Sequence, residues 1–223
     1  MSFATQWIFD NAETMSINKG PIISQTITRD QSVRTVSRGG AVWRFNVKFP
    51  DGFKYSDIRY YINEMDLNIQ TNTSVIQLSN PGYSYIVAYR GGLSSGQRSA
   101  LTMKYTSAMA ASDTTKFEVS GLPALGGGIT ESTFIFGIGD IIQKAGSKYV
   151  YTVNSDVLRG SGSTVLVPVH RTILDTPSDT ATAINIGSAC SWTVICTQKP
   201  KWKLVPGGRV EWDGEFQFYE SLL

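Results

Sequence analysis

The clearest pattern in the chain is a strict alternation of apolar and polar residues in its N-terminal third. In GGAVWRFNVKFP (39–50), every second residue from Ala41 to Phe49 is apolar and shares one face, whereas the other face carries mostly polar residues. An alternation with period two that lasts for nine residues predicts a half-buried β-strand. Two glycines precede this strand, and Pro50-Asp51-Gly52 follows it with the chemistry of a turn.

The next segment, 55–67, changes to the period of a helix. Its apolar residues recur at the spacing i, i+3, i+4 and i+7, at Ile58, Tyr61, Ile62 and Met65. This stripe predicts an amphipathic helix over 56–66, with Ser56 as its N-cap. It is the one helix that the pattern predicts, and we expect it to cover one face of a sheet.

Short strands separated by turns are predicted for most of the remaining chain. Two candidates, TSVIQLS (73–79) and YSYIVAYR (83–90), flank an Asn-Pro-Gly turn. A polar stretch with weak periodicity follows from Gly91 to Thr115 and is expected to lead into a second unit. Five strands at intervals of roughly ten residues predict a small sandwich or barrel there: TKFEVSG, FIFGIGDIIQ, YVYTVN, STVLVPV and SWTVICT.

The chain ends on a second regular alternation, in RVEWDGEFQFYESLL (209–223). Val210, Trp212, Phe216 and Phe218 share one face. Because this strand resembles the first one, we expect it to return to the N-terminal sheet, which makes the middle of the chain an insertion. The resulting prediction is an all-β protein with one short helix. Its first domain comprises 1–90 and 204–223, and the inserted domain comprises 91–203.

Composition excludes several classes of function. Charged residues make up 17% of the chain, against about 25% in ordinary soluble domains, as in proteins covered by neighbours or in Ser/Thr-rich extracellular β proteins. The net charge of +2 lacks the basic excess of a nucleic-acid-binding protein. No apolar run approaches the ~18 residues of a membrane span. The first residues lack the pattern of a secretory signal, so we expect no secretion by that route.

The stretch from Gly137 to Arg171 contains the residues most typical of an active site. GIGD resembles a phosphate loop, but it continues into a β-forming run rather than into the helix that such a loop requires. Asp140 is expected to bond to its own backbone two residues on, and His170, the only histidine, to lie at a strand end, on the surface or at an interface. We therefore expect no enzymatic step and no cofactor. If the protein were an enzyme, His170→Ala should abolish its activity.

A metal site and a disulfide are also not expected. Cys190 and Cys196 are separated by a β-forming segment, which would place them about 20 Å apart at ~3.3 Å per residue. This separation is too long for a disulfide. With a single histidine in the chain, metal ligands at short spacing are lacking as well.

Two charged segments are the candidate contact surfaces. Glu211, Asp213 and Glu215 recur on one face of the closing strand, a spacing that would suit paired carboxylates, calcium or a solvent face. The early segment SQTITRDQSVRTVSR carries three arginines, Arg29, Arg34 and Arg38. Opposite patches on one domain suit a head-to-tail ring, because a heterologous contact joins two different surfaces.

Three segments of the chain resemble the distal tail protein family of tailed bacteriophages, which is also the family of baseplate hub structural proteins. They are AVWRFNVKFPDGFKYSDIRYYINEM, FGIGDIIQKAGSKYVYTVNSDVLRGSGSTVLVPVHR and EWDGEFQFYESLL, together about a third of the chain. The resemblance implies an N-terminal β-sandwich completed by the C-terminal strand, with an inserted β-barrel of oligonucleotide/oligosaccharide-binding (OB-like) or galectin-like type.

The resemblance also implies a function and partners. Copies would form a hexameric or dodecameric ring in the virion that joins the tail tube to the tail tip or baseplate hub. The genome would pass through the ring without specific binding, and the protein would be assembled in the host cytoplasm. An alternative of another class is a carbohydrate-binding module that attaches the phage to a host glycan.

Overall fold

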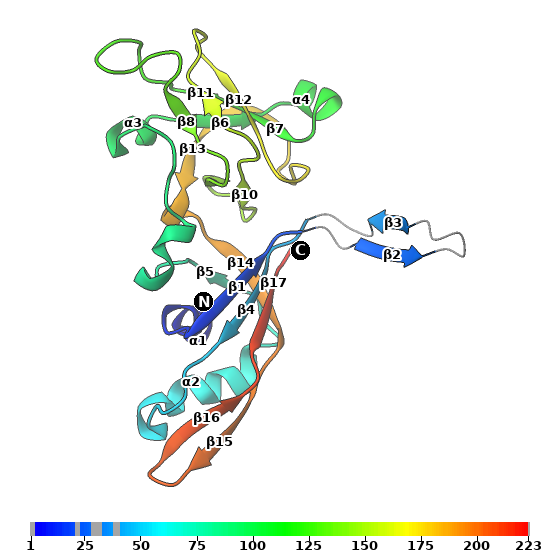
Figure 1. Cartoon of the computed structure of the whole chain (residues 1–223), viewed down its shortest axis with the longest axis vertical. Coiled ribbons are helices and arrows are strands. Elements are labelled where there is room, and N and C mark those ends of the chain that lie inside the picture. The colour runs from blue at the N-terminus through cyan, green and yellow to red at the C-terminus, as the bar shows by residue number, and fades with distance from the viewer. Residues whose placement is uncertain (1–2, 21–22, 28–32, 38–40, 223) are drawn as a thin grey trace. The chain divides into compact units, whose positions relative to one another are not determined.

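The computed structural model describes residues 3–20, 23–27, 33–37 and 41–222, and it divides into two compact units. The first unit comprises Met1–Ile76 and Thr193–Leu223, and the second comprises Gln77–Trp192. Strands dominate both units, with 37% of residues in strands and 21% in helices, which confirms the all-β prediction. Figure 1 shows that the second unit is inserted in the chain between β5 (Ser74–Ile76) and β14 (Trp192–Gln198).

The first unit is built on a five-stranded sheet with the order β1-β4-β17-β14-β5. Two β-hairpins lie in the connections between strands of this sheet. β2–β3 lies between β1 and β4, and β15–β16 lies between β14 and β17. Its remaining elements are α1 (Phe3–Asp10), β1 (Thr14–Asn18), β2 (Ile23–Ile27), β3 (Val33–Ser37), β4 (Arg44–Lys48), α2 (Tyr55–Asn68), β15 (Lys201–Val205), β16 (Arg209–Asp213) and β17 (Phe216–Glu220).

The C-terminal strand completes the N-terminal sheet, as the sequence predicts. β17 pairs antiparallel with β4, and Phe218 lies opposite Phe45. Both phenylalanines are buried, and Phe9 of α1 packs on them at ring-centroid distances of 5.1 and 5.6 Å. α1 therefore covers the apolar face that the alternation of β4 and β17 creates.

Helix α2 buries the predicted stripe. Ile58, Ile62 and Met65 are each at most 2% exposed, and Tyr61 stacks on Trp7 of α1 with ring centroids 4.2 Å apart. Ile58 and Ile62 form one apolar cluster with Val210 of β16, so the helix also holds the β15–β16 hairpin.

Several sequence predictions about the helices and strands of this fold were wrong. The helix begins at Tyr55 rather than at Ser56, and its N-cap, Lys54, forms no side-chain capping bond. The closing strand is interrupted at Gly214, whose φ of +103° separates β16 from β17. SWTVICT, expected in the insertion, forms β14 and pairs with β17 of the first sheet. This pairing explains why the second unit ends at 192 and not at 203.

The prediction of a strand over 83–90 was also wrong. Residues Pro81–Ile86 form the 3₁₀ helix η1, because the Asn80 side chain accepts a hydrogen bond from the Gly82 amide and Pro81 begins the turn. This segment belongs to the second unit, which therefore begins at Gln77 rather than at Gly91.

Further helices occur where a single helix was predicted. In addition to α1, the polar stretch 91–115 contains α3 (Ser95–Ser99) and α4 (Ser107–Ser112). Ser94 and Gln97 form a capping box that starts α3, and Thr106 caps α4 by accepting from the Met109 amide. These capping residues are a sequence signal that hydrophobic periodicity does not detect.

The second unit contains a six-stranded sheet with the order β10-β9-β13-β6-β7-β12 and a small sheet of β8 and β11. The bounds of its elements, besides η1, are α3 (Ser95–Ser99), β6 (Thr102–Tyr105), α4 (Ser107–Ser112), β7 (Lys116–Ser120), β8 (Phe134–Phe136), β9 (Ile141–Lys144), β10 (Tyr151–Thr152), β11 (Val157–Leu158), β12 (Val165–Pro168), β13 (Ser178–Ile186) and η2 (Gly187–Ala189).

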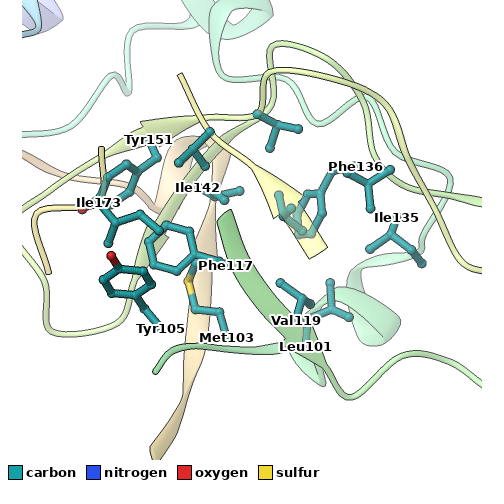
Figure 2. Close-up of a cluster of buried hydrophobic side chains, with 14 of the residues drawn as sticks. Leu101, Met103, Tyr105, Phe117, Val119, Ile135, Phe136, Ile142, Tyr151 and Ile173 are labelled. Carbon is teal, nitrogen blue, oxygen red and sulfur yellow. The ribbon is translucent and has the colours of Figure 1, made fainter. Parts of the chain in front are cut away.

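The six-stranded sheet curls until residues next to its two edge strands meet. Val153, after β10, forms an antiparallel bridge with Val169, after β12. The Asn154 amide donates to the Pro168 carbonyl at 2.9 Å and the His170 amide to the Thr152 carbonyl at 3.0 Å. We call this contact between 152–154 and 168–170 the seam. Figure 2 shows the core of the unit, with Met103, Phe117, Ile142 and Tyr151 among its buried side chains.

The core of the second unit predicts a sharp contrast between two phenylalanines of β8. Phe136 is fully buried, whereas Phe134 is 44% exposed. Phe136→Ala should lower the free energy of unfolding by about 3–5 kcal/mol because it leaves a cavity. Phe134→Ala, the matched control, should cost about 1 kcal/mol or less. Urea unfolding of the full chain would measure both, and equal losses would contradict the placement of Phe136.

Candidate functional site

Asp140, the acid of the GIGD loop, is a structural residue of the second unit. It is 1% exposed, and its carboxylate accepts hydrogen bonds from the Arg90 amide at 2.7 Å and the Gly137 amide at 2.8 Å. Burial raises the pKa of this carboxyl, and the two amide donors oppose that shift. Gly139 turns the loop with a φ of +93°. Asp140 thus joins Arg90, a distant residue in the sequence, to the GIGD loop. The sequence predicts only a bond within the local turn.

His170 belongs to the seam. Its Nδ1 accepts a hydrogen bond from the Thr152 amide at 3.0 Å, and its own amide donates to the Thr152 carbonyl. The residue lies just after β12, at the strand end that the sequence predicts, but it is half-buried rather than on the surface. A ring nitrogen in this bond acts as a structural acceptor.

Arg159 holds the glycine-rich loop that follows β11. It is 7% exposed, and its guanidinium donates to the carbonyls of Pro123, Gly160 and Gly162 at 2.8, 3.0 and 2.5 Å. The loop does not join two strands that pair with each other, because β11 pairs with β8 while β12 pairs with β7. The hydrogen bonds of the buried Arg159 side chain, rather than strand pairing, hold this loop.

The predicted acidic row lies on the β15–β16 hairpin and the turn after it, and lysines face it. Glu211 forms an ion pair with Lys203 at 3.0 Å, and the same carboxylate raises the pKa of that lysine. Asp213 lies opposite Lys201 in the strand register. Glu215, after the hairpin, is exposed. The surface is therefore one of mixed charge, and cross-strand pairing brings its two signs together.

The predicted arginine patch falls largely on residues outside the described part of the chain. Arg29 and Arg38 lie outside the described residues, and Arg34 lies in β3, where its Cα is paired with that of Thr26. β2 and β3 pair along five residues and form a two-stranded sheet of their own. Among the described residues, neither strand pairs with the five-stranded sheet.

A shallow hollow in the second unit was not found by sequence reasoning. It has a volume of about 290 Å³ and is lined by Arg90, Phe134, Gly137, Ile138 and Asp156. Ile138 is 53% exposed, and its amide donates to the Asp156 carboxylate at 2.7 Å. The lining comes from three segments that are far apart in the sequence, so no single motif could identify it.

Three tyrosines of the second unit, Tyr89, Tyr105 and Tyr151, have structural roles. Tyr105 and Tyr151 are buried in the core. The Tyr89 hydroxyl donates to the Ile135 carbonyl, and burial raises its pKa to about 12. Tyr85 is 68% exposed.

The described residues hold no group of three or more His, Cys, Asp or Glu side chains placed to bind a metal ion. Cys190 and Cys196 are buried free thiols. Burial raises the pKa of both, that of Cys196 to about 11, which makes them poor nucleophiles. Within the described part of the chain, no helix has the length and apolar character needed to cross a bilayer.

No protein-family model matches the chain, and no curated protein is significantly similar to it in sequence.

Asp140 and Asp156 provide a matched test of the loop geometry. Asp140→Ala should lower the free energy of unfolding by about 2–4 kcal/mol, because it leaves two amide donors without their acceptor in the interior. Asp156 is exposed and accepts one amide bond, so Asp156→Ala should cost about 1 kcal/mol or less. Chemical unfolding would decide, and an equal effect of both changes would argue against the role of Asp140.

Proposed function

We propose that the protein is a structural subunit of a bacteriophage tail tip or baseplate, which assembles into a ring between the tail tube and the hub. The observation that carries this proposal is the β2–β3 hairpin. Among the described residues its strands pair only with each other, and a two-stranded sheet by itself is at best marginally stable in water. Its open edges offer hydrogen-bonding groups to a strand of another chain.

Charge on and around this hairpin supports a contact with a second copy. The segment 29–38 carries Arg29, Arg34 and Arg38 in sequence. Asp213, at the end of β16, and Glu215, just after it, are exposed carboxylates of the first unit. A contact between such different surfaces is heterologous, and it closes into a ring when the rotation between neighbours allows it.

The mixed charge of β15–β16 changes what a ring would present to DNA. A uniformly acidic wall would repel phosphates, and an arginine-lined one would bind them in a salt-dependent way. Since Glu211 is engaged with Lys203, we propose that this face contacts a partner protein rather than lining the channel. The genome would then pass without specific binding, and no catalytic step is part of this function.

Assembly can be tested on the full chain by light scattering and electron microscopy of the same fraction. We expect rings of six or twelve copies with a central hole. The double variant Gln25→Pro/Thr35→Pro, at a cross-strand pair of the hairpin, should reduce the rings to monomers, since proline cannot donate to a strand ladder. The control Thr35→Val should still assemble.

Two outcomes would count against this assignment. Rings that persist in the proline variant would remove the hairpin from the contact. A wild-type chain that stays monomeric at every concentration would contradict self-assembly and favour the second candidate function.

The second candidate is binding of a host glycan, and the hollow favours it. A half-exposed aromatic residue, Phe134, lines the hollow together with Arg90 and Asp156, one residue of each charge. An aromatic face packs on the apolar side of a sugar ring, while charged groups orient its hydroxyls. An open site of about 290 Å³ is of suitable size for one or two sugar units.

Glycan-array binding of the full chain would test the hollow. If a glycan binds, Phe134→Ala and Arg90→Ala should each weaken binding by roughly tenfold or more, since each removes a direct contact. Tyr85→Ala, which changes an exposed aromatic residue outside the hollow, should leave binding unchanged. Equal loss in all three variants, or binding that none of them affects, would exclude this site.

A further inference from the structure

The strand ladder at the seam ends in an unusual way. Val153 and Val169 face each other as a pair without mutual hydrogen bonds, flanked by the bonds from Asn154 to Pro168 and from His170 to Thr152. In a regular antiparallel ladder, the Thr152 amide would donate to the carbonyl of His170. It donates instead to the Nδ1 atom of the same residue, at 3.0 Å. The imidazole thus takes the place of a backbone carbonyl.

This bond fixes the protonation state of the ring. The Thr152 amide is a donor, so Nδ1 has to accept, and the proton of the neutral imidazole lies on Nε2. A protonated imidazole carries hydrogen on both nitrogens and cannot accept. Imidazole is the side chain that ordinarily changes its charge between pH 5 and 8.

We propose that His170 makes the seam of the second unit sensitive to acid: unprotonated Nδ1 holds the Thr152 amide, and protonation releases it. The seam is a short contact, because it consists of one bridge, between Val153 and Val169, and the hydrogen bonds next to it. The loss of one bond there affects a large share of the hydrogen bonds that join the edges of the curled sheet. The change is confined to the Thr152 amide, while the bonds from Asn154 to Pro168 and from the His170 amide to the Thr152 carbonyl remain.

Other charged groups around the seam are engaged in contacts of their own. The Arg171 guanidinium donates to the Val150 carbonyl and lies over the Tyr151 ring. The Asp175 carboxylate accepts from the Tyr151 hydroxyl at 2.7 Å.

Carboxylates next to the two neighbouring strands are likewise engaged, and Glu118 of β7 forms an ion pair with Lys104. Asp113 and Lys116, on the β7 side, form an ion pair at 2.8 Å. Asp140, on the β9 side, accepts two backbone amides. Protonation of His170 is therefore the change in this region that removes an acceptor from the seam between pH 7.5 and 5.

The experiment is nitrogen-15 NMR of the full chain, purified without a histidine tag. Since the chain has one histidine, its imidazole signals need no assignment by mutation. At pH 7.5 we expect an unprotonated Nδ1 and a protonated Nε2. As the imidazole titrates toward pH 5, exchange of the Thr152 amide, normalised to the unfolded chain, should accelerate by roughly five- to tenfold, the factor for one hydrogen bond. The Val119 amide in the interior of the unit should not change.

Two variants separate the imidazole from general acid effects. His170→Asn offers a side-chain oxygen near the position of Nδ1 that does not titrate, so its Thr152 exchange should be slow and independent of pH. His170→Ala removes the acceptor, and exchange should be fast at both pH values. If the alanine variant does not fold, the wild-type titration and the asparagine variant still decide. A proton on Nδ1 at pH 7.5, an imidazole that does not titrate, or unchanged Thr152 exchange on titration would each overturn the proposal.

Discussion

The pairing of β17 with β4 is the constraint on which the first unit depends. It joins residues at the two ends of the chain, Phe45 and Phe218, in one buried layer beneath α1. Because β5 and β14 are neighbours in the same sheet, the chain between them forms a loop whose two ends are fixed close together. The entropic cost of closing a long loop grows only slowly with its length, so an entire folded unit fits between these strands.

Hydrophobic periodicity predicted the elements in which burial decides conformation. The period-two alternation located β4 and β17, whose Phe45, Val47 and Phe216 are buried. The i, i+3, i+4, i+7 stripe located α2, whose Ile58 and Ile62 are buried against Val210. In each case one face of the element is removed from water, so the spacing of apolar residues is tied directly to the geometry.

Hydrophobic periodicity failed to predict the structure where local hydrogen bonds or contacts with distant segments determine the conformation. The alternation over 83–90 is overridden by Asn80 and Pro81, which start η1. Glu211 and Asp213 lie in β16, whereas Glu215 lies beyond the break at Gly214, and the charge of this face depends on the register that brings Lys203 to Glu211. The hollow at Phe134 and the acceptor role of His170 require segments that only the folded chain brings together. Contacts of this kind produce no regular spacing of residues that could be recognised in the sequence.

The two hairpins of the first unit show how the fold leads to the assembly proposal. β15–β16 is a two-stranded sheet, but α2 packs on it through Ile58 and Ile62, and backbone bonds join Val210 to Gly52 and Phe53. Those contacts give a short ladder the support that two strands lack in water. β2–β3 has the same construction, and its strands pair only with each other among the described residues. A surface from another copy would supply to β2–β3 the kind of support that α2 gives to β15–β16.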